Sequence, residues 1–178
     1  MQFLLDNLLA LVVGTVIIGI LAFVTQQRQE ESVVVAEHYT TTSRSAALSN
    51  WLQSDLQSAT AFTSANDSTL VFSRSSDPAA LMTVQVTYRR VRIAGTPVRY
   101  QIRRQEAGSE ITVGPTVSEW TATLLTATAQ PTTVASSAKA VRIRVVTGRG
   151  FARAQAAPAP ATVWERTFSP RMLSTTTV

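Results

Sequence analysis

The sequence predicts an α+β fold in which one long N-terminal α-helix packs against an antiparallel β-sheet head domain. Residues 2–24 are almost wholly apolar, and apolar side chains then recur at helical spacing up to residue 60. Beyond that point, apolar and polar residues alternate in short runs separated by turn residues. These observations predict three parts: a hydrophobic helix over 1–25, its amphipathic continuation over 26–60, and the head over 61–178.

The apolar run over 3–24 is long enough to cross the hydrocarbon core of a bilayer, which takes about 20 residues of helix. A cleaved signal peptide would have a basic front and a small-residue cleavage site, and neither flanks this run. A plain membrane anchor fits the length but leaves Asp6 unexplained, because a carboxylate in hydrocarbon is costly unless it is paired or neutralised. We therefore expect Asp6 to pair with a free N-terminal ammonium, that of Met1 or of a neighbouring copy.

The helix is expected to continue beyond the apolar run, because no proline occurs before Pro78 and no glycine lies between Gly19 and Gly95. A polar collar over 25–32 and weak helix formers over 33–45 lead into an apolar stripe at helical spacing. The stripe consists of Leu48, Trp51, Leu52, Leu56 and Ala59. Its opposite face is polar, so we expect the stripe to pack on the head.

The head is predicted to be built from short strands that follow one another along the chain. They cover residues 69–74, 81–93, 98–103, 111–113, 120–128, 140–147 and 163–168. A turn over 94–97 joins the second and third runs into a hairpin. Gly114-Pro115 is expected to end the fourth strand, and loops are expected over 75–78, 131–137 and 148–162.

Candidate catalytic and metal-binding residues are few. The single histidine, His38, lies beside Glu37 on the predicted helix, where a solvated histidine is the expected interpretation. The chain has no cysteine, no His, Asp and Glu cluster with metal-ligand spacing, and no glycine-rich loop after a strand. We therefore expect no enzyme activity, no metal and no cofactor.

The net charge of +5 comes almost entirely from arginine. Six arginines crowd the predicted hairpin, namely Arg89, Arg90, Arg92, Arg99, Arg103 and Arg104. Together with Tyr88 and Tyr100, they could bind nucleic acid by charge and stacking. The preferred interpretation is an edge hairpin that charge protects against pairing with other strands, so nucleic acid is not expected as the main partner.

Two N-terminal strings resemble the start of type IV pilins and type II secretion pseudopilins. They are LLDNLLALVV, which contains Leu4, Leu5 and Asp6, and IIGILA over 17–22. The order of later segments, from LVFSR through YQIRR and AVRIRV to RTFSPR, is similar to the J-type minor pseudopilin, with Met172 in place of a usual asparagine. The resemblance implies a pilin-like fold and a subunit that assembles into a filament.

In that family an acid near the N-terminus meets the N-terminal amine of an adjacent subunit, so the resemblance implies this role for Asp6 and Met1. It implies filament-core packing for Phe3, Leu8, Leu11, Gly14, Ile18 and Gly19. The implied partners are further copies or other pilin-like subunits, an inner-membrane assembly platform and, before assembly, membrane lipid. The implied location is a cell-surface filament, or the inner membrane with a periplasmic head.

Gly14 and Gly19 have three open interpretations, since each costs about 1 kcal/mol relative to alanine within a helix. One is close helix packing in a membrane or filament core. The pilin resemblance implies instead that the helix melts locally near them on assembly. Glycine is also simply common in membrane helices.

Three hypotheses about function follow from the sequence. The preferred one is a structural subunit of a type IV pilin-like filament, anchored in the membrane before assembly. The second is a minor pseudopilin at the filament tip that primes assembly. The third is a single-pass anchored domain that binds a ligand or nucleic acid and does not polymerise.

Overall fold

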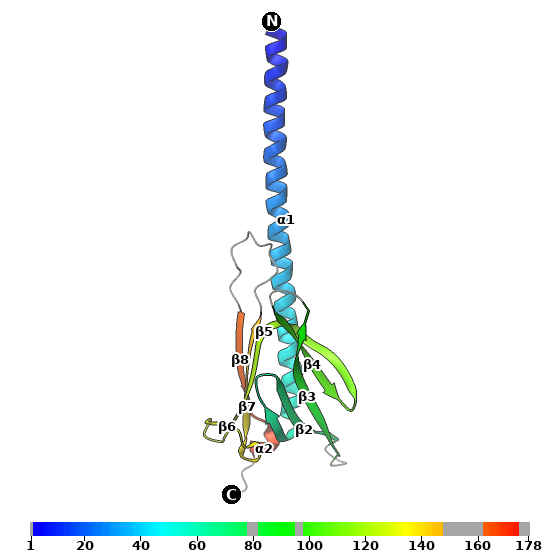
Figure 1. Cartoon of the computed structure of the whole chain (residues 1–178), viewed down its shortest axis with the longest axis vertical. Coiled ribbons are helices and arrows are strands. Elements are labelled where there is room, and N and C mark those ends of the chain that lie inside the picture. The colour runs from blue at the N-terminus through cyan, green and yellow to red at the C-terminus, as the bar shows by residue number, and fades with distance from the viewer. Residues whose placement is uncertain (1, 78–81, 95–97, 148–161, 175–178) are drawn as a thin grey trace. The chain divides into compact units, whose positions relative to one another are not determined.

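The structure of the chain is a computed structural model that describes residues 2–77, 82–94, 98–147 and 162–174. Its elements in order are α1 (Gln2–Gln57), β1 (Ala59–Ala65), β2 (Thr69–Asp77), β3 (Met82–Ile93), β4 (Arg99–Glu106), β5 (Ser109–Leu125), β6 (Pro131–Thr132), a 3₁₀ helix (Ala135–Ser137), β7 (Ala140–Thr147), β8 (Thr162–Phe168) and α2 (Arg171–Ser174). Figure 1 shows this order along the chain. One long N-terminal helix packed against an antiparallel sheet confirms the predicted α+β class. Contacts divide the chain into two units, Met1–Tyr39 and Thr40–Val178, which are described separately below.

Helix α1 runs without interruption from Gln2 to Gln57, so the weak helix formers in its middle do not break it. Two of its internal threonines satisfy their hydroxyls locally, because Thr15 and Thr25 each donate to the backbone carbonyl four residues earlier at 2.8 Å. The helix ends three residues before the predicted boundary at 60. There Ser58 donates its hydroxyl to the Asp55 carbonyl at 3.0 Å, and β1 begins at the next residue.

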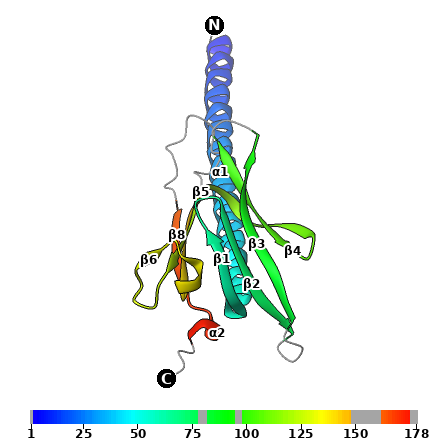
Figure 2. The same cartoon turned by 60° about the horizontal axis from the view of Figure 1, so that its bottom comes forward.

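The second unit contains one antiparallel sheet with the strand order β1-β2-β3-β4-β5-β7-β8, and β6 pairs with β5 outside this path. We call this sheet, with its short helices, the head. β1 also contacts β5, and the Ala122 amide donates to the Asn66 carbonyl at 3.3 Å. The sheet therefore curls around the C-terminal part of α1, as Figures 1 and 2 show from two directions.

Strand β5 is much longer than the sequence predicts, because Gly114-Pro115 does not end it. Gly114 takes a left-handed φ of +83°, which few other residues adopt. Between the pairs Ile102↔Val113 and Tyr100↔Val117, β5 contains extra residues that form an irregularity around the proline. The first half of β5 then pairs with β4 and the second half with β7, so this strand joins the two halves of the sheet.

Several other predicted boundaries are wrong. β1 was not predicted, because its sequence ATAFTSA has a single large apolar residue and no clear alternation. β2 continues through the predicted loop at 75–77, where it still pairs with β3. The strand predicted to end at Thr128 ends at Leu125, and the predicted loop over 131–137 contains β6 and the 3₁₀ helix. Residues 78–81, 95–97 and 148–161 of the predicted strand, turn and loops lie outside the described residues.

The core lies between the apolar stripe of α1 and the concave face of the sheet. Leu48, Leu52 and Leu56 are buried, as the stripe predicts. Trp51, by contrast, is 43% exposed and lies at the margin of the helix–sheet contact. The inward-facing strand residues confirm the predicted alternation: Val86, Tyr88, Trp120, Ala122, Leu124, Val141, Ile143 and Val145 are all buried. Each large apolar side chain buried in this way contributes roughly 1.5–3 kcal/mol.

Candidate functional site

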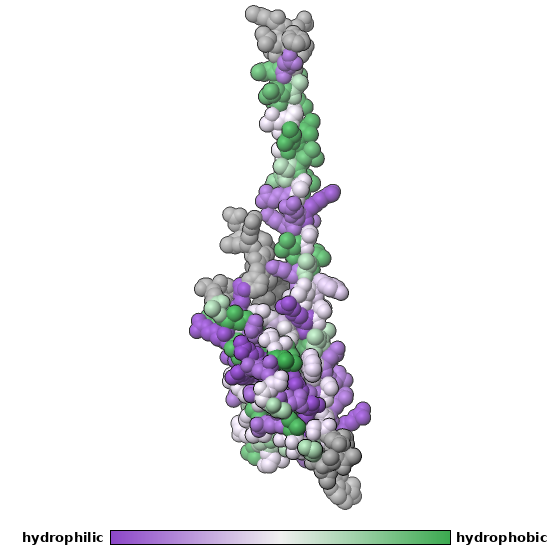
Figure 3. Space-filling model, turned by 90° about the vertical axis from the view of Figure 1, so that its right-hand side faces the viewer, coloured by the Kyte–Doolittle hydropathy of each residue, from purple (hydrophilic) through white to green (hydrophobic). Residues whose placement is uncertain are grey.

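The first unit presents an exposed apolar segment, residues 7–24 of α1. An 18-residue window of the helix has a mean hydropathy of 2.8, and by length and composition the helix can cross a membrane. Leu11 is 70% exposed, and its large apolar neighbours are exposed as well. Figure 3 shows the segment as a largely green surface followed by a purple band. Such a surface marks a contact with lipid or protein, so the segment is a candidate anchoring and assembly site.

The predicted packing residues of this segment all lie on its open surface. Leu8, Leu11 and Ile18 are exposed, and a Cβ placed on Gly14 or Gly19 would meet nothing within 4 Å. The helix is regular through both glycines in the single chain. Met1 and the side chains of Phe3 and Asp6 lie outside the described residues, so the pairing of Asp6 with an N-terminal amine stays a prediction.

A second exposed apolar surface follows the polar collar over 25–32, in which Gln26 donates to Glu30 at 3.2 Å. It consists of Val33, Val34, Val35 and Tyr39, which we call the valine band. Tyr39 is 76% exposed, the highest value among the described large apolar side chains. The polar collar separates this band from the apolar segment, so one bilayer span does not account for both surfaces.

The second unit contains a buried ion cluster made of Asp55, Arg74, Tyr88, Arg104 and Glu106. Asp55, which is 1% exposed, accepts a hydrogen bond from the Tyr88 hydroxyl at 2.6 Å. It accepts two more from Arg104, from Nε at 2.6 Å and from Nη2 at 3.0 Å. Arg74 donates from Nε to Glu106 at 2.9 Å, lies 3.6 Å from Asp55, and shares Glu106 with Arg104. Two carboxylates thus balance two guanidinium groups.

The electrostatics of this cluster keep each group in the form that its hydrogen bonds need. Burial raises the pKa of Tyr88, and the Asp55 charge raises it further, so the hydroxyl stays a donor. The hydrogen bond to Asp55 raises the pKa of Arg104 despite burial. For Glu106, burial alone would raise the pKa, but hydrogen bonds from Arg74 and Arg104 outweigh it, and the pKa falls below its ordinary value. The cluster is suited to fixing α1 on the sheet.

Sequence reasoning missed this cluster, although a signal for Asp55 exists. Asp55 lies three residues after Leu52 and one before Leu56, so helical geometry places it on the apolar stripe. Arg104 likewise shares strand parity with buried Ile102. A charged residue on each of two buried faces indicates an ion pair between them. Tyr88, which the sequence suggests only as a residue that could stack on nucleic acid, completes it.

The arginine-rich hairpin is not at the edge of the sheet, so that part of the prediction is wrong. β3 pairs with β2 on its other side, and β4 pairs with β5. Two arginines share one carboxylate, because Arg89 donates to Glu110 at 2.8 Å and Arg103 to the same carboxylate at 3.2 Å. The hydrogen bond from Arg89, with that from Arg103, holds the pKa of Glu110 below its ordinary value. Glu110 therefore offsets part of the positive charge of these two arginines.

The remaining predicted patch residues divide between two environments. Arg104 belongs to the buried ion cluster and lies over the Trp51 ring, 5.0 Å from its centroid. Arg90 lies over the Tyr100 ring at 4.2 Å, and Arg92 is exposed opposite Tyr100 in the β3–β4 register. The predicted patch thus reduces to the end of the hairpin, around Arg90 and Arg92.

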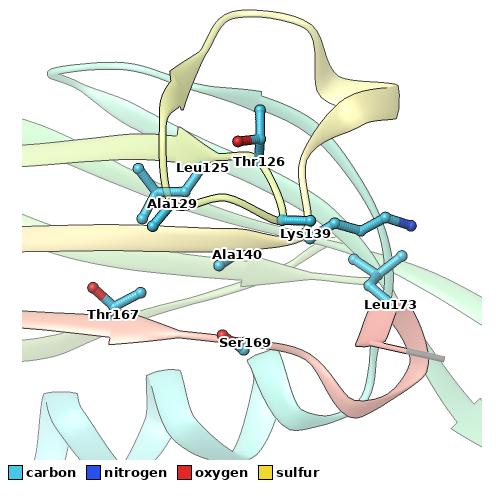
Figure 4. A pocket seen from close by; sticks show the side chains of 9 residues that line it. Leu125, Thr126, Ala129, Lys139, Ala140, Thr167, Ser169 and Leu173 are labelled. Atoms are coloured by element: carbon cyan, nitrogen blue, oxygen red, sulfur yellow. The ribbon is translucent and has the colours of Figure 1, made fainter. Parts of the chain in front are cut away.

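The cavities and polar clusters offer little ligand chemistry. A cavity of about 290 Å³ is lined by Leu125, Thr126, Ala127, Ala129, Lys139, Ala140, Thr167, Ser169 and Leu173. Lys139 is the charged residue of this lining, and Figure 4 shows its ammonium end turned away from Ala129 and Thr167. Within the described residues, no group of three His, Cys, Asp or Glu is placed to hold a metal ion, and His38 is exposed. We assign no binding site to this cavity.

Comparisons of the chain with family models, with curated proteins and with solved structures found no match. The functional interpretation therefore depends on the residues and their geometry. The exposed apolar segment and the valine band are the candidate functional surfaces. The buried ion cluster fixes the last turns of the same helix on the sheet.

Proposed function

We propose that this chain is a structural subunit of a type IV pilin-like filament. Before assembly, the apolar segment over 7–24 anchors it in a membrane. During assembly, the same segment leaves lipid and packs against the helices of neighbouring copies. The subunit then resides in a cell-surface filament, or in the inner membrane with its head in the periplasm when it is not assembled.

The observation that carries this proposal is the single helix from Gln2 to Gln57. Its N-terminal part is apolar and exposed, and its C-terminal part supplies Leu48, Leu52 and Leu56 to the core of the head. One continuous helix thus supplies both the exposed contact surface and part of the folded domain. A helix of this kind suits a subunit whose position in an assembly is set through its helix.

The valine band supports assembly over a plain single-pass anchor. A membrane anchor needs only the span, and the band lies beyond the polar collar, where lipid tails do not reach. Exposed apolar side chains at that position gain from contact with another protein surface. Packing between copies supplies that contact along the whole exposed part of the helix.

Asp6 takes a specific role in this proposal. A carboxylate within an apolar helix is stabilised when it meets an N-terminal ammonium, and a neighbouring copy supplies one. Such a pair would fix how far one helix is displaced along the next. Gly14 and Gly19 present surface without side chains, which allows two helix backbones to approach closely.

The test is electron microscopy of cells and of purified full-length protein carrying Asp6→Ala. We expect filaments from the unchanged chain and few or none from Asp6→Ala. The control is Asp6→Glu, which keeps the charge and is expected to restore assembly. A second control, Asn7→Ala, changes the neighbouring residue without removing a charge and is expected to leave assembly intact.

The alternatives predict other results. Detergent-solubilised monomers under all conditions, with no filaments, would favour the non-polymerising anchored domain. Short, stoichiometric complexes with other pilin-like subunits would favour a minor subunit at the tip. Unchanged filaments from Asp6→Ala would contradict the role of Asp6 and leave the filament itself in place.

A further inference from the structure

The described acids of the head are mostly neutralised within the head. Five of them lie within ion-pair distance of an arginine: Asp55, Glu106, Glu110, Glu119 and Glu165. The helix of the first unit differs. Among the described residues, Glu31 and Glu37 make no ion pair, and Glu30 accepts a hydrogen bond from Gln26. Acids without an ion pair therefore lie on the helix between residues 30 and 37, with Arg28 before them and Arg44 after them.

Two arginines that make no ion pair with a described residue lie at one end of the β3–β4 hairpin. Arg90 and Arg92 lie on the same side of β3, two residues apart, and Arg92 pairs in register with Tyr100. Neither arginine makes an ion pair with any described residue, in contrast to Arg89 and Arg103 on the same hairpin. We call Arg90, Arg92, Tyr100 and the exposed Val98 the basic hairpin end.

The acids of the helix are arranged around the valine band. Glu30 and Glu37 are seven residues apart, which places them on one side of the helix and about 10 Å apart along its axis. Val33 and Val34 lie between them on that side, whereas the helical rotation of about 100° per residue places Val35 and Tyr39 on the opposite side. We call Glu30, Val33, Val34 and Glu37 the acidic helix face.

We propose that the acidic helix face of one copy binds the basic hairpin end of a second copy. This inference rests on the proposed function, because it needs copies that lie side by side. Arg90 and Arg92 would meet Glu30 or Glu37, and Val98 and Tyr100 would cover Val33 and Val34. The chain itself thus supplies a partner that is both basic and apolar, as the acidic helix face requires.

Charge and apolar area together favour a second copy over anionic lipid or nucleic acid. A phosphate-bearing partner would neutralise Arg90 and Arg92, but it would leave Glu30, Glu37 and the two valines between them uncovered. A second copy accounts for both surfaces at once. Opposite charges flanking an apolar contact also fix the register in which two copies meet.

The test uses the cysteine-free background of the chain. The full chain carrying both Glu37→Cys and Arg92→Cys is oxidised in membranes and in assembled material, then analysed on a non-reducing gel. Because each copy then has one thiol on each surface, contact between copies is expected to give a ladder of multimers. The matched control pairs Glu37→Cys with Thr128→Cys, an exposed position in the turn after β5, and is expected to give no ladder.

Charge reversal gives a second readout that does not depend on thiols. Arg92→Glu or Glu37→Arg alone is expected to lower the assembled fraction about tenfold, because like charges then face each other across the contact. Combining the two reversals in one chain is expected to restore most of it. Both residues lie outside the core, so neither reversal is expected to change the stability of the head. The melting temperature of each variant measures this.

The outcomes separate this inference from the proposed function. Filaments that form normally, without a ladder and without sensitivity to charge reversal, would overturn this contact and leave the filament proposal intact. Loss of assembly by Arg92→Glu that Glu37→Arg does not restore would assign the arginines to another anionic partner, such as lipid, and would also overturn it. Monomers under every condition would overturn both proposals.

Discussion

Asp55 is the acceptor of the fully buried side-chain hydrogen bonds that join the described parts of helix and sheet. Its carboxylate receives the Tyr88 hydroxyl and two nitrogens of Arg104, and these three donors come from β3 and β4. Removing a buried charge from water is costly, and the full set of hydrogen bonds is what offsets that cost. The cluster therefore stabilises one arrangement of helix and sheet, and it is sensitive to the loss of any member.

We expect Asp55→Asn to lower the free energy of unfolding of the head by about 3–5 kcal/mol, because it leaves two arginines beside a single carboxylate. Tyr88→Phe removes one hydrogen bond and is expected to cost about 1 kcal/mol. Urea unfolding followed by tryptophan fluorescence measures both, since Trp120 is buried in the same core. Asp67→Asn changes an exposed turn residue and serves as the control, within about 0.5 kcal/mol. An Asp55→Asn variant as stable as the control would show that the cluster contributes little.

The free energy of unfolding of the head is expected to depend on pH through the carboxyl group of Glu106. Its folded-state pKa lies below its ordinary value of 4.5, so it binds protons less readily in the folded head than in the unfolded chain. Its contribution is complete above pH 4.5 and is lost as the pH falls through the lower, folded-state pKa. The melting temperatures of the unchanged chain and Glu106→Gln should therefore differ at neutral pH and converge in acid. A difference that stays constant with pH would contradict this assignment.

At the scale of elements, helix α1 and strand β5 determine each other's placement. Leu48 of the helix lies against Gly114 of the strand, so closely that a Cβ on Gly114 would come within 2.9 Å of the Leu48 Cβ. The glycine serves two purposes, since it also adopts a left-handed φ. Close approach at this position lets one strand pass beside the helix and continue from the β4 half of the sheet to the β7 half.

Gly114→Ala and Gly108→Ala form a matched pair that separates these two purposes. Both glycines have a left-handed φ, but a Cβ on Gly108 would meet nothing within 4 Å. Gly108→Ala is expected to cost about 1 kcal/mol from backbone strain alone. Gly114→Ala is expected to cost roughly 1–3 kcal/mol more, because the new methyl group overlaps Leu48. Equal losses in a thermal or urea unfolding experiment would show that Leu48 moves aside freely.

The elements that sequence reasoning predicted are those with strong periodicity. The stripe of α1 and the alternation of β7 each indicate one buried face, and the structure confirms both. The wrong predictions concern features that leave no periodic pattern in the sequence. Pro115 stays inside β5 because an irregularity absorbs it, and β1 is held by its neighbours although its own pattern is weak. Asp55 was overlooked because the stripe was defined by its apolar members alone, although an acid on that stripe and Arg104 on a buried strand face together indicate an ion pair.

At the scale of the whole molecule, the chain combines an apolar helix that needs cover with a head that folds around the end of the same helix. The first unit alone buries almost none of its apolar side chains. The second unit has its own core and its own ion pairs. We therefore expect membrane attachment and head stability to respond to different substitutions.

Val16→Arg and Val35→Arg test this separation. Arginine at the middle of a span costs about 2.5–3.5 kcal/mol on insertion scales, so Val16→Arg is expected to reduce the carbonate-resistant membrane fraction sharply. Val35 is equally apolar and exposed but lies beyond the polar collar, so Val35→Arg is expected to leave that fraction unchanged. Loss of attachment in both variants would extend the membrane contact past the collar. Retention in both would argue against a span over 7–24.

The direct passage from α1 into β1 has a mechanical consequence. Only Ser58 separates the helix from the strand, so the head has no slack loop at that junction. Tension applied to the exposed part of the helix would reach the sheet through the side chains of Leu48, Leu52, Asp55 and Leu56. A force along the helix axis acts on all of these side-chain contacts at the same time, as in shear. The contacts must therefore break nearly together. The head is therefore built to carry a sustained pull on its helix without giving way one contact at a time.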